Sequence, residues 1–248
     1  MFYFGVPLKS QKLAKNWDLT VELVNNTFRS MLAQTDLNFR ILLACHEPPA
    51  LAMDPDPRVE ILTVDFPRPI FRDEPNVDKH RKREVIAARI RELGGGVVMF
   101  VDADDLVSNR LVEYVNHNPH PHGHYVQQGY EFNAQTRAIR SCPWFYRICG
   151  SCALLNLRPE DLPQRAMEET SSRFRQLALH AHPTWPAVMA SEGSPLAPLP
   201  FPAVMYVTHT GENMSDSQDP AGFRRRLLRV AFREHHPSHS LKLEFAIR

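Results

Sequence analysis

The sequence predicts an α/β fold in which helices flank a mostly parallel, Rossmann-like central sheet, with a small irregular subdomain beside it. Apolar runs of strand length alternate with segments of helical periodicity through the first half of the chain. These runs are nearly continuous, as is typical of strands buried on both faces of a parallel sheet. Six prolines fall between Pro183 and Pro202, and we expect no regular structure there.

Length and composition narrow the class of protein before any motif is considered. The chain has 248 residues, 43% of them hydrophobic, which is enough for one substantial core. A formal net charge of +1 argues against a nucleic-acid partner. The apolar runs fall short of the roughly 20 residues of a membrane span, and the first residues do not resemble a signal peptide. Four irregularly spaced cysteines do not form a secreted disulfide framework, so we expect a cytoplasmic location.

Individual elements follow from periodicity and from the residues that begin and end each segment. Expected strands in the first half cover residues 2–6, 39–45, 59–64 and 97–101. Expected helices cover 16–34, capped by Asn16, and 78–93, and a further helix follows Ser108. Strand candidates in the second half are 125–132, 138–145 and 203–208, residues 148–157 form another apolar stretch, and helix candidates are 160–179 and 223–233. Parallel strands would place the loops that begin at Pro7, His46, Asp65 and Asp102 at one edge, where ligands bind.

The strongest functional signal is a run of aspartates directly after the most apolar expected strand. This strand is followed by Asp102, Ala103, Asp104 and Asp105. In an extended segment residues two apart face the same way, so Asp102 and Asp104 can converge on one ligand. Carboxylate oxygens suit Mg²⁺ or Mn²⁺, and these ions in turn bind diphosphates. The alternative is a turn with a helix cap, but the position at the ligand-binding edge favours a metal site.

The order of these features resembles the glycosyltransferase A fold, and specifically the family 2-like glycosyltransferases that use sugar nucleotides. That pattern has an amino-terminal strand ending near a proline, a helix, a second strand, a basic segment, and an apolar strand ending in Asp-x-Asp. The matching segments here are 2–7, 16–34, 39–47, 78–83 and 97–105. The resemblance covers residues 1–115 well and the remainder loosely.

The resemblance implies a role for each matching position. Asp104 would hold the metal, and Asp102 would face the ribose or share the metal, which would neutralise charge on the departing nucleotide. Glu47 stands where such enzymes usually carry an aspartate that reads the base or ribose. Further donor contacts would come from Pro7, Lys9, Lys79, Lys82 and Arg83. For the last three residues a solvated helix face is the alternative.

A late histidine and a base would complete the site. His209 ends an apolar strand and resembles the extra metal ligand that related enzymes supply, although a surface or capping histidine would look the same. The Glu-Asp pair and downstream basic-Trp motif of inverting members are absent. Candidates for a base are Glu131, His182 and Glu169, although a solvated helix face explains Glu169 more simply. A retaining mechanism would need no such base.

These features predict a glycosyltransferase that needs Mn²⁺ or Mg²⁺ and transfers a sugar from a nucleotide-diphosphate sugar, with UDP as the expected nucleotide. The acceptor would be a glycan, a lipid-linked molecule or a small molecule, and the resemblance implies bacterial surface polysaccharide synthesis as a setting. One alternative is a non-catalytic nucleotide-sugar binding protein of the same fold. Another is an Asp-x-Asp phosphotransferase or phosphatase, but such enzymes usually carry the motif on their first strand.

We expect one catalytic domain over residues 1–218, with a nucleotide-sugar half over 1–115 and an acceptor half over 116–218. Residues 219–248 would form a basic, helical carboxyl-terminal extension. Its amphipathic segment 223–233 would suit peripheral contact with the inner face of a membrane, contact with a partner, or packing against the domain.

Two further clusters carry residues that can bind metals. Cys149 and Cys152 have the spacing of a redox or zinc pair, but they lie in an apolar stretch, which favours buried thiols. The second cluster comprises His117, His120, His122 and His124. A metal-binding tract is one interpretation, but the sequence sets no geometry, so a surface loop is favoured.

Overall fold

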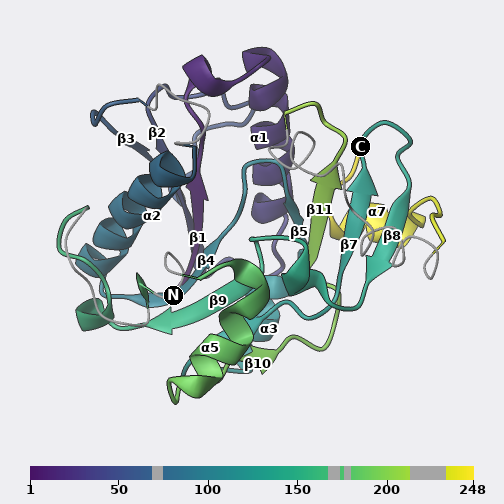
Figure 1. The fold of residues 1–248 in the computed structure, drawn as a ribbon. Helices are drawn as coiled ribbons and strands as arrows, with labels where there is room; N and C mark the ends of the chain where they lie inside the picture. The colour runs from purple at the N-terminus through teal and green to yellow at the C-terminus, as the bar shows by residue number, and fades with distance from the viewer. Residues whose placement is uncertain (69–74, 167–173, 176–179, 213–232) are drawn as a thin grey trace.

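Two β-sheets, with helices around them, make up the part of the chain that the computed structural model describes (Figure 1). The described residues are 1–68, 75–166, 174–175, 180–212 and 233–248. Seven strands form the main sheet in the order β10-β6-β9-β4-β1-β2-β3, and four form a second sheet in the order β5-β11-β7-β8. The expected α/β class, with a central sheet and flanking helices, is confirmed.

The main sheet combines a parallel half with a mixed half. Its strands are β1 (Phe2–Pro7), β2 (Phe39–Cys45), β3 (Val59–Thr63), β4 (Gly96–Phe100), β6 (Gly123–Tyr125), β9 (Ala153–Leu157) and β10 (Ala197–Pro198). Strands β3, β2, β1 and β4 are parallel neighbours, so their carboxyl ends lie at one edge. Strand β9 runs antiparallel to both β4 and β6. The sheet is therefore mixed, and the parallel arrangement that the sequence predicts holds for its first four strands along the chain.

The second sheet lies against the carboxyl-terminal end of the chain. Its strands are β5 (Leu106–Val107), β7 (Gly129–Asn133), β8 (Ile139–Cys142) and β11 (Val204–Thr208). Strand β11 pairs antiparallel with β5 and parallel with β7. Phe245, directly after helix α7 (His239–Glu244), is completely buried in a small core with Phe132, Ile139 and Met205. Residues from the far end of the chain thus cover this sheet.

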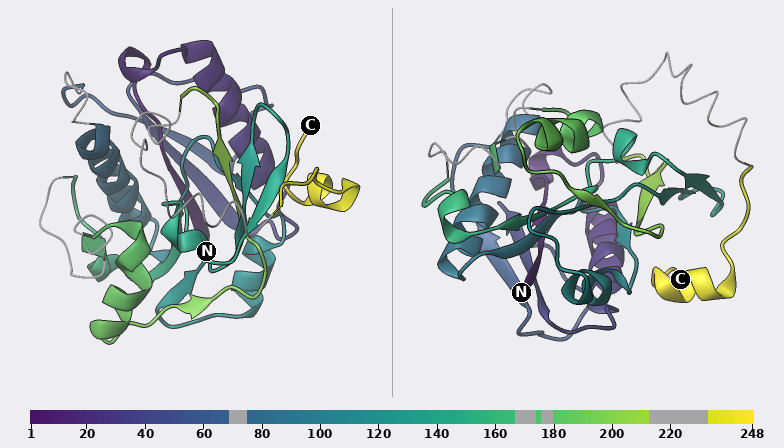
Figure 2. Two further views of the ribbon diagram at one scale, coloured as in Figure 1. Left: turned by 45° about the vertical axis from the view of Figure 1, so that its right-hand side comes forward. Right: turned by 90° about the horizontal axis from the view of Figure 1, so that it is seen from below.

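Helices cover both faces of the parallel strands. The α-helices besides α7 are α1 (Trp17–Leu32), α2 (Pro75–Glu92), α3 (Leu111–His117) and α5 (Trp185–Ser191). The 3₁₀ turns are η1 (Gln11–Leu13), η2 (Phe145–Arg147), η3 (Pro159–Asp161) and η4 (His182–Thr184). Figure 2 shows α1 and α2 on opposite faces of the sheet. Helix α1 begins as expected, because the Asn16 side chain accepts a hydrogen bond from the Leu19 N–H (3.1 Å).

The centre of the main sheet is closely packed around β1. All six residues of β1 are buried, which explains why its sequence is apolar without alternation. Gly5 lies against the ring of Phe100, where an added Cβ would come within 2.8 Å of a ring carbon. A glycine in β1 therefore allows the last residue of β4 to pack inward at the edge that carries the aspartates.

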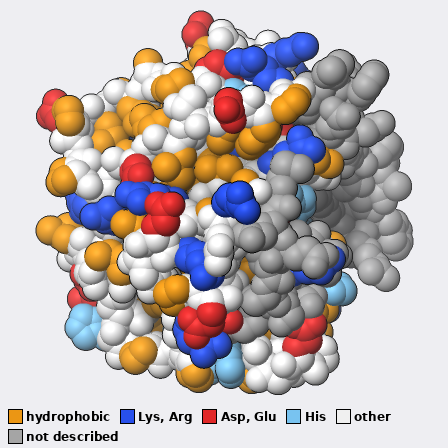
Figure 3. Space-filling model, turned by 90° about the vertical axis from the view of Figure 1, so that its left-hand side faces the viewer, with side chains coloured by type: hydrophobic (Ala, Val, Ile, Leu, Met, Phe, Trp, Pro, Cys, Tyr) orange, Lys and Arg blue, Asp and Glu red, His pale blue; other side chains and the backbone are white. Residues whose placement is uncertain are grey.

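The surface around α2 and β3 carries charges of both signs. On the face in Figure 3, which lies at the left of Figure 1, basic, acidic and hydrophobic side chains are interspersed. Arg89 of α2 pairs with Glu60 of β3 (2.8 Å) and with Glu92 (2.6 Å). None of the described helices combines the length and apolar character needed to cross a membrane.

Several expectations for the second half need correction. The proline-rich segment is not irregular throughout, since α5 begins at Trp185 with Pro186 in its first turn, where a missing N–H is not needed. The expected strand 125–132 is divided into β6 and β7. Much of the expected helix 160–179 lies outside the described residues, and its described start contains the turn η3. The expected helix 223–233, apart from its last residue, also lies outside them.

Candidate functional site

The aspartate run forms a turn at the edge where the parallel strands end. Strand β4 ends at Phe100, and the Asp105 N–H donates to the Asp102 carbonyl oxygen (3.0 Å) before β5 begins at Leu106. The neighbouring strand β1 ends at Pro7 on the same edge. The aspartates therefore lie at the edge of the sheet where ligands of α/β proteins bind.

Asp105 is the buried anchor of this turn. Its side chain is completely buried and accepts from the Ser151 hydroxyl (2.6 Å) and the Cys149 thiol (3.0 Å). Its second oxygen accepts from the Val207 N–H (3.3 Å), and the Ser151 Oγ accepts from the Asp102 N–H (2.9 Å). Burial, followed by the charges of the neighbouring aspartates, raises the pKa of Asp105 well above its ordinary value. Asp105 thus fastens the end of β4, strand β11 and the turn 149–151 together.

Asp102 is half-buried beside basic side chains of α2. Its Oδ1 lies 2.5 Å from the Lys79 Nζ. Arg83 is 5% exposed, its guanidinium carbon lies 5.3 Å from the centre of the Phe100 ring, and its Nε has no hydrogen-bond partner among the described residues. Burial alone would raise the pKa of Asp102, but the charges of Lys79 and Arg83 hold it below its ordinary value. Asp102 is therefore ionised at neutral pH.

Asp104 has a different electrostatic environment. Burial and the charge of Asp102 raise the pKa of Asp104 to about 6, against the lowering influence of Lys79 and Lys9. Its negative charge is therefore only partly offset by neighbouring lysines. A further cation beside Asp104 would favour the ionised form of its carboxyl group.

Lys82 lies on the same helix as Lys79 but is completely buried. Its Nζ donates to the Leu8 carbonyl oxygen (2.6 Å) and to the Asp78 Oδ2 (2.7 Å). Burial lowers the pKa of Lys82, whereas the hydrogen bond and charge of Asp78 raise it. His46, after β2, lies 3.8 Å from the other oxygen of Asp78. This cluster joins α2 to the loops after β1 and β2, and the predicted contact of Lys82 with a phosphate stays a prediction.

Glu212 is a residue of this edge that the sequence analysis did not single out. Its carboxylate pairs with the Lys9 Nζ (2.5 Å) and accepts from the N–H groups of Lys15 (3.2 Å) and Asn16 (2.6 Å). Burial alone would raise the pKa of Glu212, but these donors hold it below its ordinary value. The only sequence signal for it is an acidic residue three positions after His209. Glu212 connects the chain after β11 to the start of α1.

Glu47, the expected reader of the base or ribose, lies in the loop after β2. Its carboxylate accepts from the Gln11 N–H (3.0 Å) and from the Arg68 Nε (2.7 Å). Burial alone would raise the pKa of Glu47, but these two donors hold it below its ordinary value. Glu47 therefore holds the loop after β1 close to the loop after β2.

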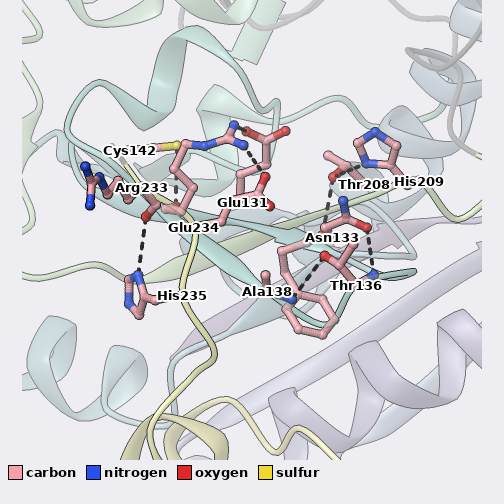
Figure 4. Close-up of polar contacts among 12 residues, drawn as sticks. Glu131, Asn133, Thr136, Ala138, Cys142, Thr208, His209, Arg233, Glu234 and His235 are labelled. Atoms are coloured by element: carbon pink, nitrogen blue, oxygen red, sulfur yellow. Dashed lines mark hydrogen bonds and ion pairs between the residues drawn. The ribbon is translucent and has the colours of Figure 1, made fainter. Parts of the chain in front are cut away.

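His209 directly follows β11, the strand that passes the aspartate turn. Two residues before His209, the Val207 N–H donates to the Asp105 carboxyl group (3.3 Å). His209 has a φ of 58°, and its Nδ1 lies 3.0 Å from the Thr208 Oγ1 (Figure 4). Within the described ranges no group of three or more His, Cys, Asp or Glu side chains is arranged to hold a metal ion. A metal site of Asp102, Asp104 and His209 stays a prediction.

The structure describes one of the two carboxylates that are candidates for a base. Glu131, on β7, forms an ion pair with Arg140 (2.7 Å), which also pairs with Glu234 of the carboxyl-terminal segment (Figure 4). Glu131 is therefore part of an ion-pair network that joins β7, β8 and the carboxyl-terminal segment. Glu169 lies outside the described residues.

His182, in η4, is half-buried and close enough to Asp102 for their charges to interact. Its Nδ1 lies 2.7 Å from the Tyr146 carbonyl oxygen. Because a carbonyl oxygen only accepts, Nδ1 carries the proton and Nε2 has the lone pair of a base. Burial lowers the pKa of His182, whereas Tyr146 and Asp102 raise it. His182 is therefore neutral at pH 7, as a general base must be.

Cys149 and Cys152 are free, buried thiols, as the sequence analysis favours. Burial is the largest influence on both groups and raises the pKa of each. The Cys149 thiol donates to Asp105, so its role is structural support of the aspartate turn. The sequence signal for this arrangement is a third aspartate directly after Asp104.

Comparison with known proteins does not identify a family for this chain. It matches no protein-family model, and no curated protein matches it significantly. The functional interpretation therefore depends on the residues and the geometry described above.

Proposed function

We propose that this protein is a metal-dependent glycosyltransferase of the glycosyltransferase A type, which transfers a sugar from a nucleotide-diphosphate sugar to an acceptor hydroxyl. The observation that carries the proposal is the position of Asp102 and Asp104 at the carboxyl edge of four parallel strands, beside Lys79 and Arg83. Carboxylates that can hold a cation and basic groups that can meet phosphates suit a nucleotide diphosphate.

The donor set at this edge fits a hard divalent cation, either Mn²⁺ or Mg²⁺. Asp104, whose pKa is raised to about 6 by burial and by the charge of Asp102, lies where additional positive charge is favourable. Asp104 and Asp102 would hold the ion, and diphosphate oxygens, water and His209 would complete its ligands. When bound, the ion would neutralise negative charge on the diphosphate.

Two side chains, Lys79 and His182, would have further roles in the transfer. In the reaction the bond from the anomeric carbon to the diphosphate oxygen breaks, and its electron pair stays on the diphosphate. A bond from the acceptor oxygen to the anomeric carbon forms, and the acceptor hydroxyl releases its proton. Lys79 can turn from Asp102 to a phosphate oxygen, since their ion pair is partly exposed. His182 would accept the proton at Nε2.

Thermal unfolding with Mn²⁺ and UDP tests the donor site. A ligand at a hundredfold excess over its Kd stabilises the native state by about 2.7 kcal/mol, so Tm should rise by several degrees. Asp104→Asn should lose most of this rise, because the amide carries no negative charge for the ion. Asp54→Asn is the matched control, since Asp54 lies exposed in a loop and should leave the rise unchanged.

Turnover separates an enzyme from a binding protein of the same fold. We expect release of UDP from a UDP-sugar, and His182→Gln should lower kcat while leaving the UDP-dependent rise in Tm intact. Absence of a Tm rise with every nucleoside diphosphate would contradict the donor site. Binding without turnover over a broad panel of acceptors would favour a non-catalytic protein.

A further inference from the structure

A cavity of about 220 Å³ lies at the opposite end of β4 from the aspartate turn. Its lining includes Gly96 and Val97 at the start of β4 and Val115 and Asn116 of α3. Figure 1 shows α3, β9 and β10 gathered at this end of the molecule, near the amino terminus. At about 3.3 Å per residue, Gly96 and Asp102 are roughly 20 Å apart along the strand. The cavity is therefore separate from the proposed donor site.

Two histidines of the cluster at residues 117–124 line this cavity. They are His120, which is half-buried before β6, and His124, which lies on β6. The two ring centres are 5.7 Å apart. His124 is 4% exposed, and its Nδ1 has no hydrogen-bond partner within the described ranges. Burial and the charge of His120 lower the pKa of His124, so its ring is neutral at pH 7.

The distance between the two rings suits a shared metal ion. A zinc–nitrogen bond of about 2.1 Å puts the centre of each ligating ring roughly 3.2 Å from the metal. Two rings on one metal therefore have centres at most about 6.4 Å apart, a limit that the pair meets. The His120 Nδ1 lies 3.4 Å from the His122 N–H, a long contact that a metal bond could replace.

Neighbouring contacts hold the backbone of this segment and the His124 ring in place. The Asn156 side chain on β9 donates to the His120 carbonyl oxygen (3.3 Å), and the Asn156 N–H donates to the His122 carbonyl oxygen (3.2 Å). The Tyr114 ring of α3 packs edge-on against the His124 ring, with centres 6.1 Å apart. The segment is thus attached to both a strand and a helix, which limits the reorganisation that metal binding would need.

We propose that His120 and His124 form a binding site for a transition-metal ion of the Zn²⁺ type at this cavity. Neutral imidazole is the commonest protein ligand for such ions. Because no group of three or more potential side-chain ligands is arranged for a metal in the described part of the chain, water would complete the coordination. The site is therefore open and exchangeable.

Calorimetric titration with Zn²⁺ alone at pH 7.5 tests this site. The titrated protein carries Asp104→Asn, so that the proposed donor site does not contribute. We expect one Zn²⁺ per chain, and His120→Ala should weaken binding by about tenfold or more, since even hydrogen-bond partners of metal ligands contribute that much. His117→Ala is the matched control, because His117 is exposed in the same tract and its Nδ1 contacts the Glu113 carbonyl oxygen (2.8 Å).

Two results would overturn the proposal. One is the absence of Zn²⁺ binding by the folded protein, and the other is equal binding by the His120→Ala variant. His124→Ala offers a second measurement, with circular dichroism to verify folding, because His124 is buried in β6. If that variant does not fold, His120→Ala alone decides the question. The titration uses neither UDP nor Mn²⁺, so its failure is distinct from failure of the proposed function.

Discussion

Lys79 and Lys82 lie one turn apart on α2, and each forms an ion pair with an aspartate. The Lys82 side chain is completely buried, and its pair with Asp78 lies beside the Leu8 carbonyl oxygen. The pair of Lys79 with Asp102 is about a quarter exposed, with 28% and 27% of the two side chains accessible to solvent. The same residue types thus form a sealed contact between elements and an open contact at the sheet edge.

Access to solvent, and not residue type, distinguishes the two pairs. Removing one partner of a buried pair leaves an uncompensated charge in a medium that solvates it poorly. An exposed pair contributes little to stability, and either partner can exchange to another charged group. We therefore expect stability to depend on Lys82 and ligand binding to depend on Lys79.

The largest effect on stability is expected for Lys82→Met. This change leaves Asp78 buried without its cation and should lower the free energy of unfolding by about 3–5 kcal/mol. Urea denaturation measures the loss, and a second change, Asp78→Asn, should restore part of it. A loss as small as that of an exposed pair would mean that the cluster is open to solvent.

Asp105→Ala should have the next largest effect. It removes the acceptor for Ser151, Cys149 and the Val207 N–H, and unsatisfied buried donors should cost about 2–3 kcal/mol. Asp105→Asn retains an acceptor oxygen and should lose less, as measured by the same denaturation experiment. Equal losses in the two variants would contradict the anchoring role of Asp105.

A pH-dependent effect is expected at Asp104. Its pKa is raised to about 6 in the folded protein, so its protonated form adds stability below the unfolded pKa of about 3.9. This contribution is lost as the pH rises toward 6, and Asp104→Asn should remove that part of the pH dependence. Urea denaturation at a series of pH values provides the measurement. Parallel stability curves for the two proteins would contradict the raised pKa.

The smallest effect on stability is expected for Lys79→Met. Its partly exposed pair with Asp102 should contribute about 1 kcal/mol or less to the free energy of unfolding. The same change should weaken Mn²⁺-dependent UDP binding, measured by calorimetry, because it removes a cation beside the diphosphate. Unchanged UDP binding would show that Lys79 is not part of the proposed donor site. The two lysine–aspartate pairs would then differ only in their contribution to stability.

Local sequence patterns were sufficient to predict the strands and helices of the first half of the chain. They predicted the elements of the second half much less well. Strands β1 to β4 and helices α1 and α2 lie close to the expected ranges, because burial on both faces and helical periodicity leave direct traces in sequence. The antiparallel entry of β9 between β4 and β6 depends on pairing between distant segments. Helix α5 is not among the expected elements, because six prolines in one segment predict irregular structure, whereas Pro186 occupies a helix start.

The residue pattern alone predicts that Asp102 and Asp104 follow a buried strand and that basic residues of one helix can approach them. The different burial of the two lysines follows from the tertiary structure, because they lie about one turn apart on the same helix and differ in the chain segments that pack over them. The tertiary structure also sets the anchoring contacts of Asp105 and brings His120 and His124 to the same cavity. Burial and proximity arise from contacts between distant segments, which a local pattern of residues does not encode.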